Sequence, residues 1–459
     1  MTGVPTSGAT PSGSAATSLG WAGIVRLGLV QTALGAIVVL TTSTMNRLMV
    51  VELALPATLP GLLVGVHYAV QILRPRLGFG SDVGGRRTPW ILGGMAVLGL
   101  GAVLAALAIA WMGVQLVPGL ALALAAFVLI GLGVGAAGTS LLVLLAKRVD
   151  PPRRAAAAST VWVMMILGFI LTAALVGRAI DPYTPLRLVL VSAAVVLAAL
   201  AVTAVAVWGM EPLASDAGAP APQATGPRFA AALGEVWHEP RARRFAVFVF
   251  VSMLAYSMQD LILEPFAGTV FGFTPGESTR LSGVQNTGVL LGMLLVAFAC
   301  SGPQRLRIGS LRSWTVAGCI ASAAALLLLV VAALAGPAWP LRASVFLLGL
   351  TNGAYAVAAI GSMMALVGAG TERREGVRMG LWGAAQAIAF GLGGLAGTVA
   401  SDIARWLLGA PSMAYAVVFC GEALLFLLAA GLAMRLDAAP NRVGRRVPNL
   451  GAAGTLGRS

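Results

Sequence analysis

Two short segments far apart in the chain carry ionisable residues within otherwise apolar sequence. The first reads TMNRLMVVELALPA and holds Arg47 and Glu52; the second reads YSMQDLILEPFAG and holds Asp260 and Glu264. Asp260 and Glu264 are four residues apart, so on a helix they share one face. A charge at membrane depth is costly unless it is paired. We therefore expect Arg47 to pair with Asp260 or Glu264 and to close one end of a cleft. The alternative is that each charge reaches the headgroup region.

The elements that must position these residues are long apolar stretches. Hydrophobic residues make up 58% of the chain and charged residues 10%, and the mean hydropathy is +0.91. Crossing a bilayer takes a helix of ~20 apolar residues, and only helices or closed barrels satisfy their backbone in lipid. We predict an all-α integral membrane protein with twelve transmembrane helices. The expected spans are 25–50, 57–75, 88–112, 116–146, 155–179, 186–209, 244–266, 280–300, 313–335, 341–368, 378–402 and 412–434.

The spans divide six and six around one long polar loop. The sequence of this loop begins as a Pro/Ala/Gly linker and continues from Phe229 to Arg244 with alternating apolar and basic residues. We interpret it as a tether between two bundles; the alternative for its second part is an amphipathic helix on the membrane surface. The expected organisation is a disordered tail at 1–23, a six-helix bundle at 24–209, a cytoplasmic linker at 210–243, a second bundle at 244–436 and a flexible tail at 437–459.

The basic residues indicate the orientation of the chain. Most of the 30 Lys and Arg residues fall in the tails and the even-numbered loops, which the positive-inside rule places in the cytoplasm together with both termini. The net charge of +14 is explained by this topology and by anionic lipid headgroups, so no nucleic-acid partner is expected. The arginines left for the opposite side are Arg47, Arg178, Arg187, Arg280, Arg342 and Arg405.

The strongest general motif lies between the second and third spans. It reads GFGSDVGGRR, begins at Gly78 and includes Asp82, Gly85, Arg86 and Arg87. It resembles the G-x-x-x-D-(R/K)-x-G-R-(R/K) signature of the major facilitator superfamily, although a valine follows the aspartate here. An aspartate that pairs with arginines in only one gate position would bias a rocking motion between halves. The alternative is that the two arginines only determine topology. Six plus six helices with this motif imply the pseudo-symmetric fold of that superfamily.

The segments around Arg47 and Asp260 support a narrower resemblance. The strings N-R-x-M-x-V-E-L and Q-D-x-x-L-E-P-F-x-G resemble the PucC-type bacteriochlorophyll-delivery family of phototrophic bacteria. The resemblance extends from Arg26 to about Leu436. It implies a light-harvesting assembly factor in the inner, intracytoplasmic membrane, with lipid, bacteriochlorophyll and light-harvesting polypeptides as partners. The bacteriochlorophyll synthase is a further candidate partner. The resemblance implies bacteriochlorophyll as a bound ligand, and no cofactor is required.

Several polar residues within spans could hold such a pigment. His67, in VGVHYAV, offers a neutral imidazole that suits the magnesium of a chlorophyll; the alternative is a hydrogen bond to a neighbour. Side-chain amides could bind a pigment carbonyl, and Glu422 is either a packing partner or a functional acid. The amide candidates are Asn46, Gln259, Gln285, Asn286 and Gln386.

Glycines recur at three- and four-residue spacing in the fourth and eleventh spans. These are Gly131, Gly133, Gly135 and Gly138 in one, and Gly391, Gly393, Gly394 and Gly397 in the other. Such spacing lets helices pack closely in lipid; the alternative is a groove for a flat macrocycle. We favour close packing.

Three functions remain open at this point. The first is a pigment-handling assembly factor. The second is a proton-coupled transporter of a small solute, with Asp260, Glu264 or Glu422 as the proton carrier. The third is a pathway enzyme, which we do not expect, because the sequence holds no catalytic constellation and no Asp-rich prenyl-diphosphate motif. The absence of a phosphate-binding loop argues against ATP drive. Cys300, Cys319 and Cys420 and two histidines also lack metal-site spacing.

Overall fold

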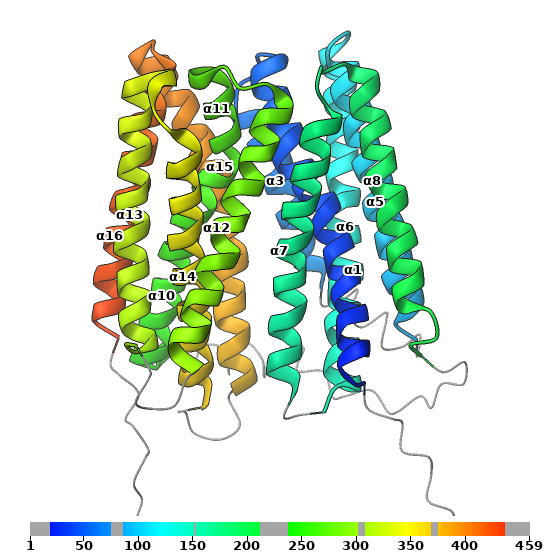
Figure 1. Cartoon of the computed structure of the whole chain (residues 1–459), viewed down its shortest axis with the longest axis vertical. Helices are drawn as coiled ribbons and strands as arrows, with labels where there is room; N and C mark the ends of the chain where they lie inside the picture. Colours follow the sequence, from blue (N-terminus) through cyan, green and yellow to red (C-terminus); the bar gives the residue numbers. More distant parts are fainter. Residues whose placement is uncertain are drawn as a thin grey trace, which may run out of the picture.

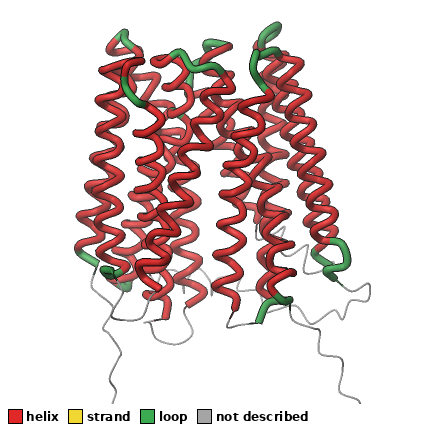
Figure 2. The backbone as a smooth tube through the Cα atoms, viewed as in Figure 1, coloured by secondary structure: helices red, strands yellow, loops and turns green. Residues whose placement is uncertain are grey.

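The structure is a computed structural model that describes residues 19–74, 86–150, 153–211, 237–301, 308–368 and 375–436. Those residues form a bundle of helices in two halves (Figures 1 and 2). The helices of the first half are α1 (Trp21–Val39), α2 (Met45–Arg47), α3 (Thr58–Val70), α5 (Thr88–Met112), α6 (Leu116–Arg148), α7 (Arg154–Ala179) and α8 (Pro185–Val207). Those of the second half are α10 (Pro240–Met258), α11 (Leu263–Phe271), α12 (Pro275–Ser301), α13 (Leu311–Ala335), α14 (Leu341–Gly368), α15 (Glu375–Leu408) and α16 (Pro411–Met434).

Twelve membrane-crossing segments are present in the described part of the chain. Eleven helices are long and apolar enough to span a bilayer, and the shorter apolar helix Thr58–Leu73 supplies the twelfth segment. The expected fold class is therefore confirmed. Two expected boundaries shift: the first helix begins at Trp21, inside the tail expected at 1–23, and α10 begins at Pro240, inside the linker expected at 210–243. Residues 212–236 of that linker, and residues 1–18 and 437–459 at the chain ends, lie outside the described residues.

The first membrane segment is irregular where it carries its polar residues. Two π-helical stretches, Leu40–Thr44 and Leu48–Glu52, flank the short helix α2. Thr41 and Thr42 donate their hydroxyl protons to the carbonyls of Ile37 and Val38 one turn earlier, at 3.2 and 2.9 Å. Side-chain donors of this kind compete with the backbone ladder and bend helices. The local sequence thus loosens the segment that carries Arg47.

The seventh membrane segment is broken near its middle, and a proline leaves one backbone carbonyl at the break without a helical donor. A 3₁₀ turn, Gln259–Leu261, separates α10 from α11. Pro265 has no N–H, so the carbonyl of Leu261 one turn earlier has no helical donor. Asn46 of the first half supplies the donor from its Nδ2 at 2.6 Å. The break in one half is therefore completed by a residue of the other.

The two halves meet through two helix pairs. α7 packs against α12, and α3 packs against α15. Two sets of polar contacts between the halves join the C-terminal ends of α7 and α15 to the N-terminal ends of α12 and α3. These ends lie opposite the start of α1 and the end of α16 (Figure 1). We call this region the closed end.

Candidate functional site

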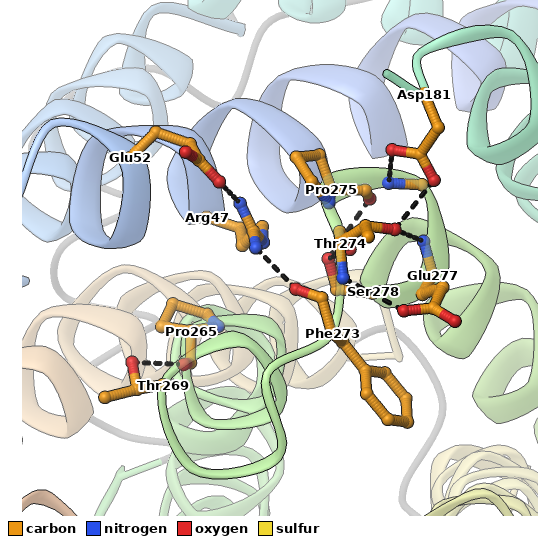
Figure 3. A network of polar contacts seen from close by, with 11 residues as sticks. Arg47, Glu52, Asp181, Pro265, Thr269, Phe273, Thr274, Pro275, Glu277 and Ser278 are labelled. Atoms are coloured by element: carbon orange, nitrogen blue, oxygen red, sulfur yellow. Dashed lines mark hydrogen bonds and ion pairs between the residues drawn. The ribbon is translucent and has the colours of Figure 1, made fainter. Parts of the chain in front are cut away.

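Arg47 lies at the centre of the closed end and links the two halves. Its guanidinium is buried and forms an ion pair with Glu52 at 2.5 Å. Its Nη2 donates a hydrogen bond to the backbone carbonyl of Phe273 in the second half at 2.6 Å (Figure 3). Burial, together with the nearby Glu52 carboxylate, raises the pKa of Tyr183 in the loop after α7. Arg47 thus contacts the second half through a hydrogen bond to a backbone carbonyl, whereas its ion-pair partner lies in its own membrane segment.

The expected ion pair between Arg47 and Asp260 or Glu264 is wrong for this structure. Arg47 is followed by a loosened π-helical turn, which brings Glu52 back to it five residues later. Among the described residues, Glu264 instead accepts hydrogen bonds at Oε1 from the hydroxyls of Ser43 and Ser282, the latter at 2.5 Å. These serines lie in the first half and on α12, so the acid still joins the halves, but through hydroxyls.

Asp181 provides a contact between the halves that the sequence analysis did not single out. It follows α7, and its Oδ1 accepts the backbone N–H of Gly276 at 2.9 Å in the first turn of α12. Its Oδ2 accepts the hydroxyl of Thr274 at 2.7 Å. Thr274 and Glu277 form a reciprocal capping box of 3.0 and 3.2 Å at the same helix start (Figure 3). A carboxylate from the first half therefore caps a helix of the second.

Asp402 makes the matching contact in the opposite sense. It lies near the end of α15 and accepts the backbone N–H groups of Ala57 and Thr58 at 3.0 and 2.7 Å, where α3 begins. It also accepts the Thr58 hydroxyl at 2.7 Å. In a six-plus-six chain, the fifth and eleventh spans are equivalent, as are the second and eighth. Asp181 and Asp402 are therefore counterparts, and each places a negative charge at a helix N-terminus, where it is favourable.

Glycines allow this close approach at both contacts. A Cβ at Gly276 would overlap Asp181 and the carbonyl of Gly177, and one at Gly61 would overlap the hydroxyl of Thr398. Elsewhere, Gly131 lies against the carbonyl of His67 and Gly397 against that of Met258. The packing interpretation of the repeated glycines is confirmed at these positions.

Below the closed end, Asp260 lies where α3 of the first half faces α10 and α15 of the second. It lies deep in the protein, yet its side chain is solvent-accessible, whereas Gln259 and Leu261 beside it are buried. It interacts electrostatically with Tyr68 of α3 and Tyr256 of α10. The Phe390 ring of α15 lies 6.1 Å from the Tyr68 ring and 5.9 Å from the Tyr256 ring. We call Asp260, Tyr68, Tyr256 and Phe390 the aromatic chamber.

The residues expected to bind pigment differ in how far they are buried. His67 is buried, and its Nε2 lies 2.8 Å from the side-chain nitrogen of Gln71, as the alternative for this residue anticipated. Asn46 and Gln259 are also buried. Gln285 and Asn286 are half-buried on α12. None of the five belongs to the aromatic chamber, and their binding role stays a prediction.

Glu422 is wholly enclosed by the second half. Its exposed fraction is 0%, and neither carboxylate oxygen has a hydrogen-bond partner in the described part of the chain. Asp260 acts on it electrostatically. Its position in the core among Phe419 and Phe426 fits the packing alternative better than contact with a ligand.

The motif between the second and third spans is only partly visible. Gly78, Asp82 and Gly85 lie outside the described residues, so its gating role stays a prediction. The backbone N–H groups of Arg87 and Thr88 donate to the Glu211 carboxylate at 2.8 and 2.7 Å. Arg86 lies just before these two residues, and its Nε is buried. The two arginines therefore adjoin a helix start held by an acid that follows α8.

Two six-helix halves that meet at one end have the fold of the major facilitator superfamily. Solved transporters share this fold. The chain superposes on the peptide transporter POT bound to sulfate with a TM-score of 0.67 at 15% identity, covering 92% of this chain and 96% of that one. A bacterial homologue of the lysosomal transporter Spinster, in its inward-facing and occupied conformation, gives 0.65 at 14% identity, covering 90% and 95%.

The chain belongs to the PUCC protein family, whose profile matches residues 44–440. It is 54% identical over 434 residues to the bacteriochlorophyll synthase 44.5 kDa chain of Rhodobacter capsulatus, covering 94% of this chain and 99% of that protein. It is 29% identical to protein PucC of the same organism, covering 90% and 92%. The expected family is confirmed, and the chain is a multi-pass membrane protein.

Proposed function

We propose that this protein handles bacteriochlorophyll in the membrane and delivers it to light-harvesting antenna polypeptides. The observation that carries the proposal is the match, over nearly the whole of both chains, to a protein named for bacteriochlorophyll synthesis, together with membership of the PUCC family. The geometry is compatible with an apolar, flat ligand, because the space between the halves is lined by aromatic rings and one acid. Sites of this make-up are typical of small-molecule binding.

The orientation proposed from the basic residues gives the site a direction. The protein lies in the inner or intracytoplasmic membrane with both termini in the cytoplasm. The closed end then faces away from the cytoplasm. The aromatic chamber then opens towards the cytoplasmic side. Alternating closure of the two ends, as in other transporters with repeated halves, would give the pigment a route between that side and the membrane.

The role proposed here is non-enzymatic, although one relative is named as a synthase chain. The pigment would arrive finished, and antenna polypeptides, with the bacteriochlorophyll synthase as a further partner, would meet the protein in the membrane. No group of this chain is assigned to bond making or breaking.

Deleting the gene from a phototrophic bacterium tests the function. The deletion strain is expected to lose antenna absorbance while total bacteriochlorophyll, extracted in solvent, continues to be made. Complementation with the intact gene should restore the antenna. Loss of pigment synthesis itself would instead indicate an enzymatic step, and unchanged antenna levels would contradict the proposal.

The second candidate is a proton-coupled transporter of a small solute. Its support is the fold, which the chain shares with a D-xylose–proton symporter at a TM-score of 0.65 and 15% identity, and the three acids in or near the spans of the second half. A fold hosts many functions, so this support is weaker. Uptake of labelled sugars, peptides and nucleosides into vesicles with and without the protein separates the two candidates.

A further inference from the structure

Asp260 differs from the other acids of the membrane segments in what surrounds it. The Glu264 carboxylate accepts two serine hydroxyls and is buried, and Glu422 is enclosed in the apolar core. Asp260 is solvent-accessible, and no hydrogen bond or ion pair reaches it from the described residues. A carboxylate at membrane depth without a cation is costly. Asp260 is therefore the acid whose missing partner can come from a ligand.

The surroundings of Asp260 restrict the shape of that ligand. Tyr68 comes from the first half, whereas Tyr256 and Phe390 come from two helices of the second. α15 packs against both α3 and α10, so Phe390 stands between the two tyrosines. The Tyr68 and Tyr256 rings are half-buried, as is the Phe390 ring. Partly exposed ring faces beside one carboxylate fit a flat, aromatic molecule.

The carboxylate restricts the chemistry of that ligand. Magnesium is a hard cation that prefers oxygen ligands, and in a chlorophyll its axial position is open. His67 was the expected axial ligand, but its side chain is buried, its Nε2 is in contact with Gln71, and its Nδ1 is shielded from solvent although it has no partner among the described residues. Asp260 is the middle residue of the 3₁₀ turn Gln259–Leu261, which interrupts the α-helix. Its side chain is exposed there, whereas those of its two neighbours are buried.

We propose that the Asp260 carboxylate is the axial ligand of the magnesium of a bound bacteriochlorophyll, with Tyr68, Tyr256 and Phe390 against the macrocycle. The assignment rests on the proposed function. It adds that both halves contribute to one site, because the ring of Tyr68 belongs to the half opposite Asp260. Opening of the closed end would then separate the pigment from the wall that Tyr68 provides.

The test compares two pigments that differ only at the metal. Purified protein in mild detergent is titrated with bacteriochlorophyll and with magnesium-free bacteriopheophytin, and affinity is measured by the change in absorption. Asp260→Ala is expected to weaken binding of the magnesium pigment about tenfold or more, as loss of one strong polar contact does. Binding of the magnesium-free pigment should change far less. His67→Ala removes a ring whose centroid lies 5.0 Å from that of Tyr68, so it should affect both affinities alike, because it removes no magnesium ligand.

A second variant separates ligation from folding. Asp260→His supplies another magnesium ligand and is expected to retain the magnesium pigment with altered resonance Raman bands of the metal. Glu277→Gln, an acid at the closed end, is the matched control, and every variant is first checked for a monodisperse elution profile. Equal loss of both pigments in Asp260→Ala, or no loss of either, overturns the assignment while the function stands. Failure of the unaltered protein to bind either pigment overturns the proposed function instead.

Discussion

At the scale of single residues, the closed end depends on a buried arginine whose partners lie in both halves. Arg47 pairs with Glu52, whose side chain is 34% exposed, and donates to the Phe273 carbonyl. Removing the arginine leaves that carbonyl without its donor and Glu52 without its cation. Because Glu52 is partly solvated, the loss of the ion pair alone is small, and most of the cost comes from the buried polar groups.

Arg47→Gln is expected to destabilise the protein by about 1–2 kcal/mol, the range for a lost hydrogen bond to a buried group. The measurement is the apparent melting temperature in detergent. The double variant Arg47→Gln/Glu52→Gln should be little worse than Arg47→Gln alone, because the two residues act as a pair. Arg187→Gln is the control and should have little effect, because Arg187 lies in the first turn of α8 and donates only to the carbonyl of Pro182 in the preceding loop of the same half. Additive losses in the double variant would contradict the pairing.

A charge swap at Arg47 tests which acid is its partner. Arg47→Glu should be rescued in part by Glu52→Arg, because these side chains are in contact at 2.5 Å. Glu264→Arg should give no rescue, since Glu264 is bonded to Ser43 and Ser282. Antenna absorbance in the complemented deletion strain measures the rescue. Rescue by Glu264→Arg alone would show that a conformation with the originally expected pair carries the function.

The sequence identified the residues of the closed end better than their partners. Arg47, Glu52, Asp260 and Glu264 are conspicuous because charges are rare in apolar segments. Their pairing depended on π-helical turns that bring Glu52 back to Arg47, and no residue pattern predicts such turns. Tyr68, Tyr256 and Phe390 could not be selected, because aromatic residues in spans are common, and only the packing of α15 between α3 and α10 brings them together.

At the scale of elements, two carboxylates cap helices across the interface. Asp181 caps α12 and Asp402 caps α3, so this part of the stabilisation of each helix start exists only while the halves are closed there. Helix capping within one element stabilises that element in every conformation. Capping between halves stabilises one conformation relative to the other. The twelve spans followed from hydropathy, but these caps could not, because an aspartate at a span end carries no indication of which helix it faces.

Asp402→Ala is expected to cost about 0.5–2 kcal/mol, the range for loss of a helix cap, and to shift the protein towards opening at the closed end. Spin labels placed in the exposed loops of the two halves at that end, with their distance distribution measured, report the opening. Thr184→Ala is the matched control, because Thr184 caps α8 within its own half at 3.1 Å. It should lower stability without lengthening the distance. Equal distance distributions for both variants would contradict a role between halves.

Gly276→Ala tests the same end by steric means. A methyl group there would overlap Asp181 and Gly177, so the variant is expected to lengthen the same label distance. Gly421→Ala on α16 is the control, because nothing lies within 4 Å of the position that its Cβ would occupy. It should leave the distance unchanged. An unchanged distance in Gly276→Ala would mean that α7 and α12 do not need this close approach.

At the scale of the whole molecule, the polar contacts between the halves gather at one end, and the aromatic chamber lies below them. The pseudo-symmetry of the chain explains why the contacts come as a pair: equivalent spans provide Asp181 and Asp402. The breaks in the first and seventh spans are also equivalent by position, and the Asn46–Leu261 hydrogen bond joins them. The irregular backbone is thus located where the two halves meet, as it is in transporters built from repeated halves.

This arrangement predicts which side of the membrane reaches the chamber. In a variant without native cysteines, Tyr256→Cys is expected to react with a membrane-impermeant maleimide from the cytoplasmic side only, because the closed end shields it from the other. Thr279→Cys, on α12 and bonded to Thr44 at 3.0 Å, should react from neither side.

Val114→Cys, in the loop between α5 and α6 and 81% exposed, is the control and should react from the non-cytoplasmic side. Labelling of Val114→Cys from the cytoplasm would reverse the proposed orientation, whereas labelling of Tyr256→Cys from the non-cytoplasmic side would mean that the closed end does not seal. Pigment that occupies the chamber should protect Tyr256→Cys and leave Val114→Cys reactive, since only the former lies against the bound macrocycle.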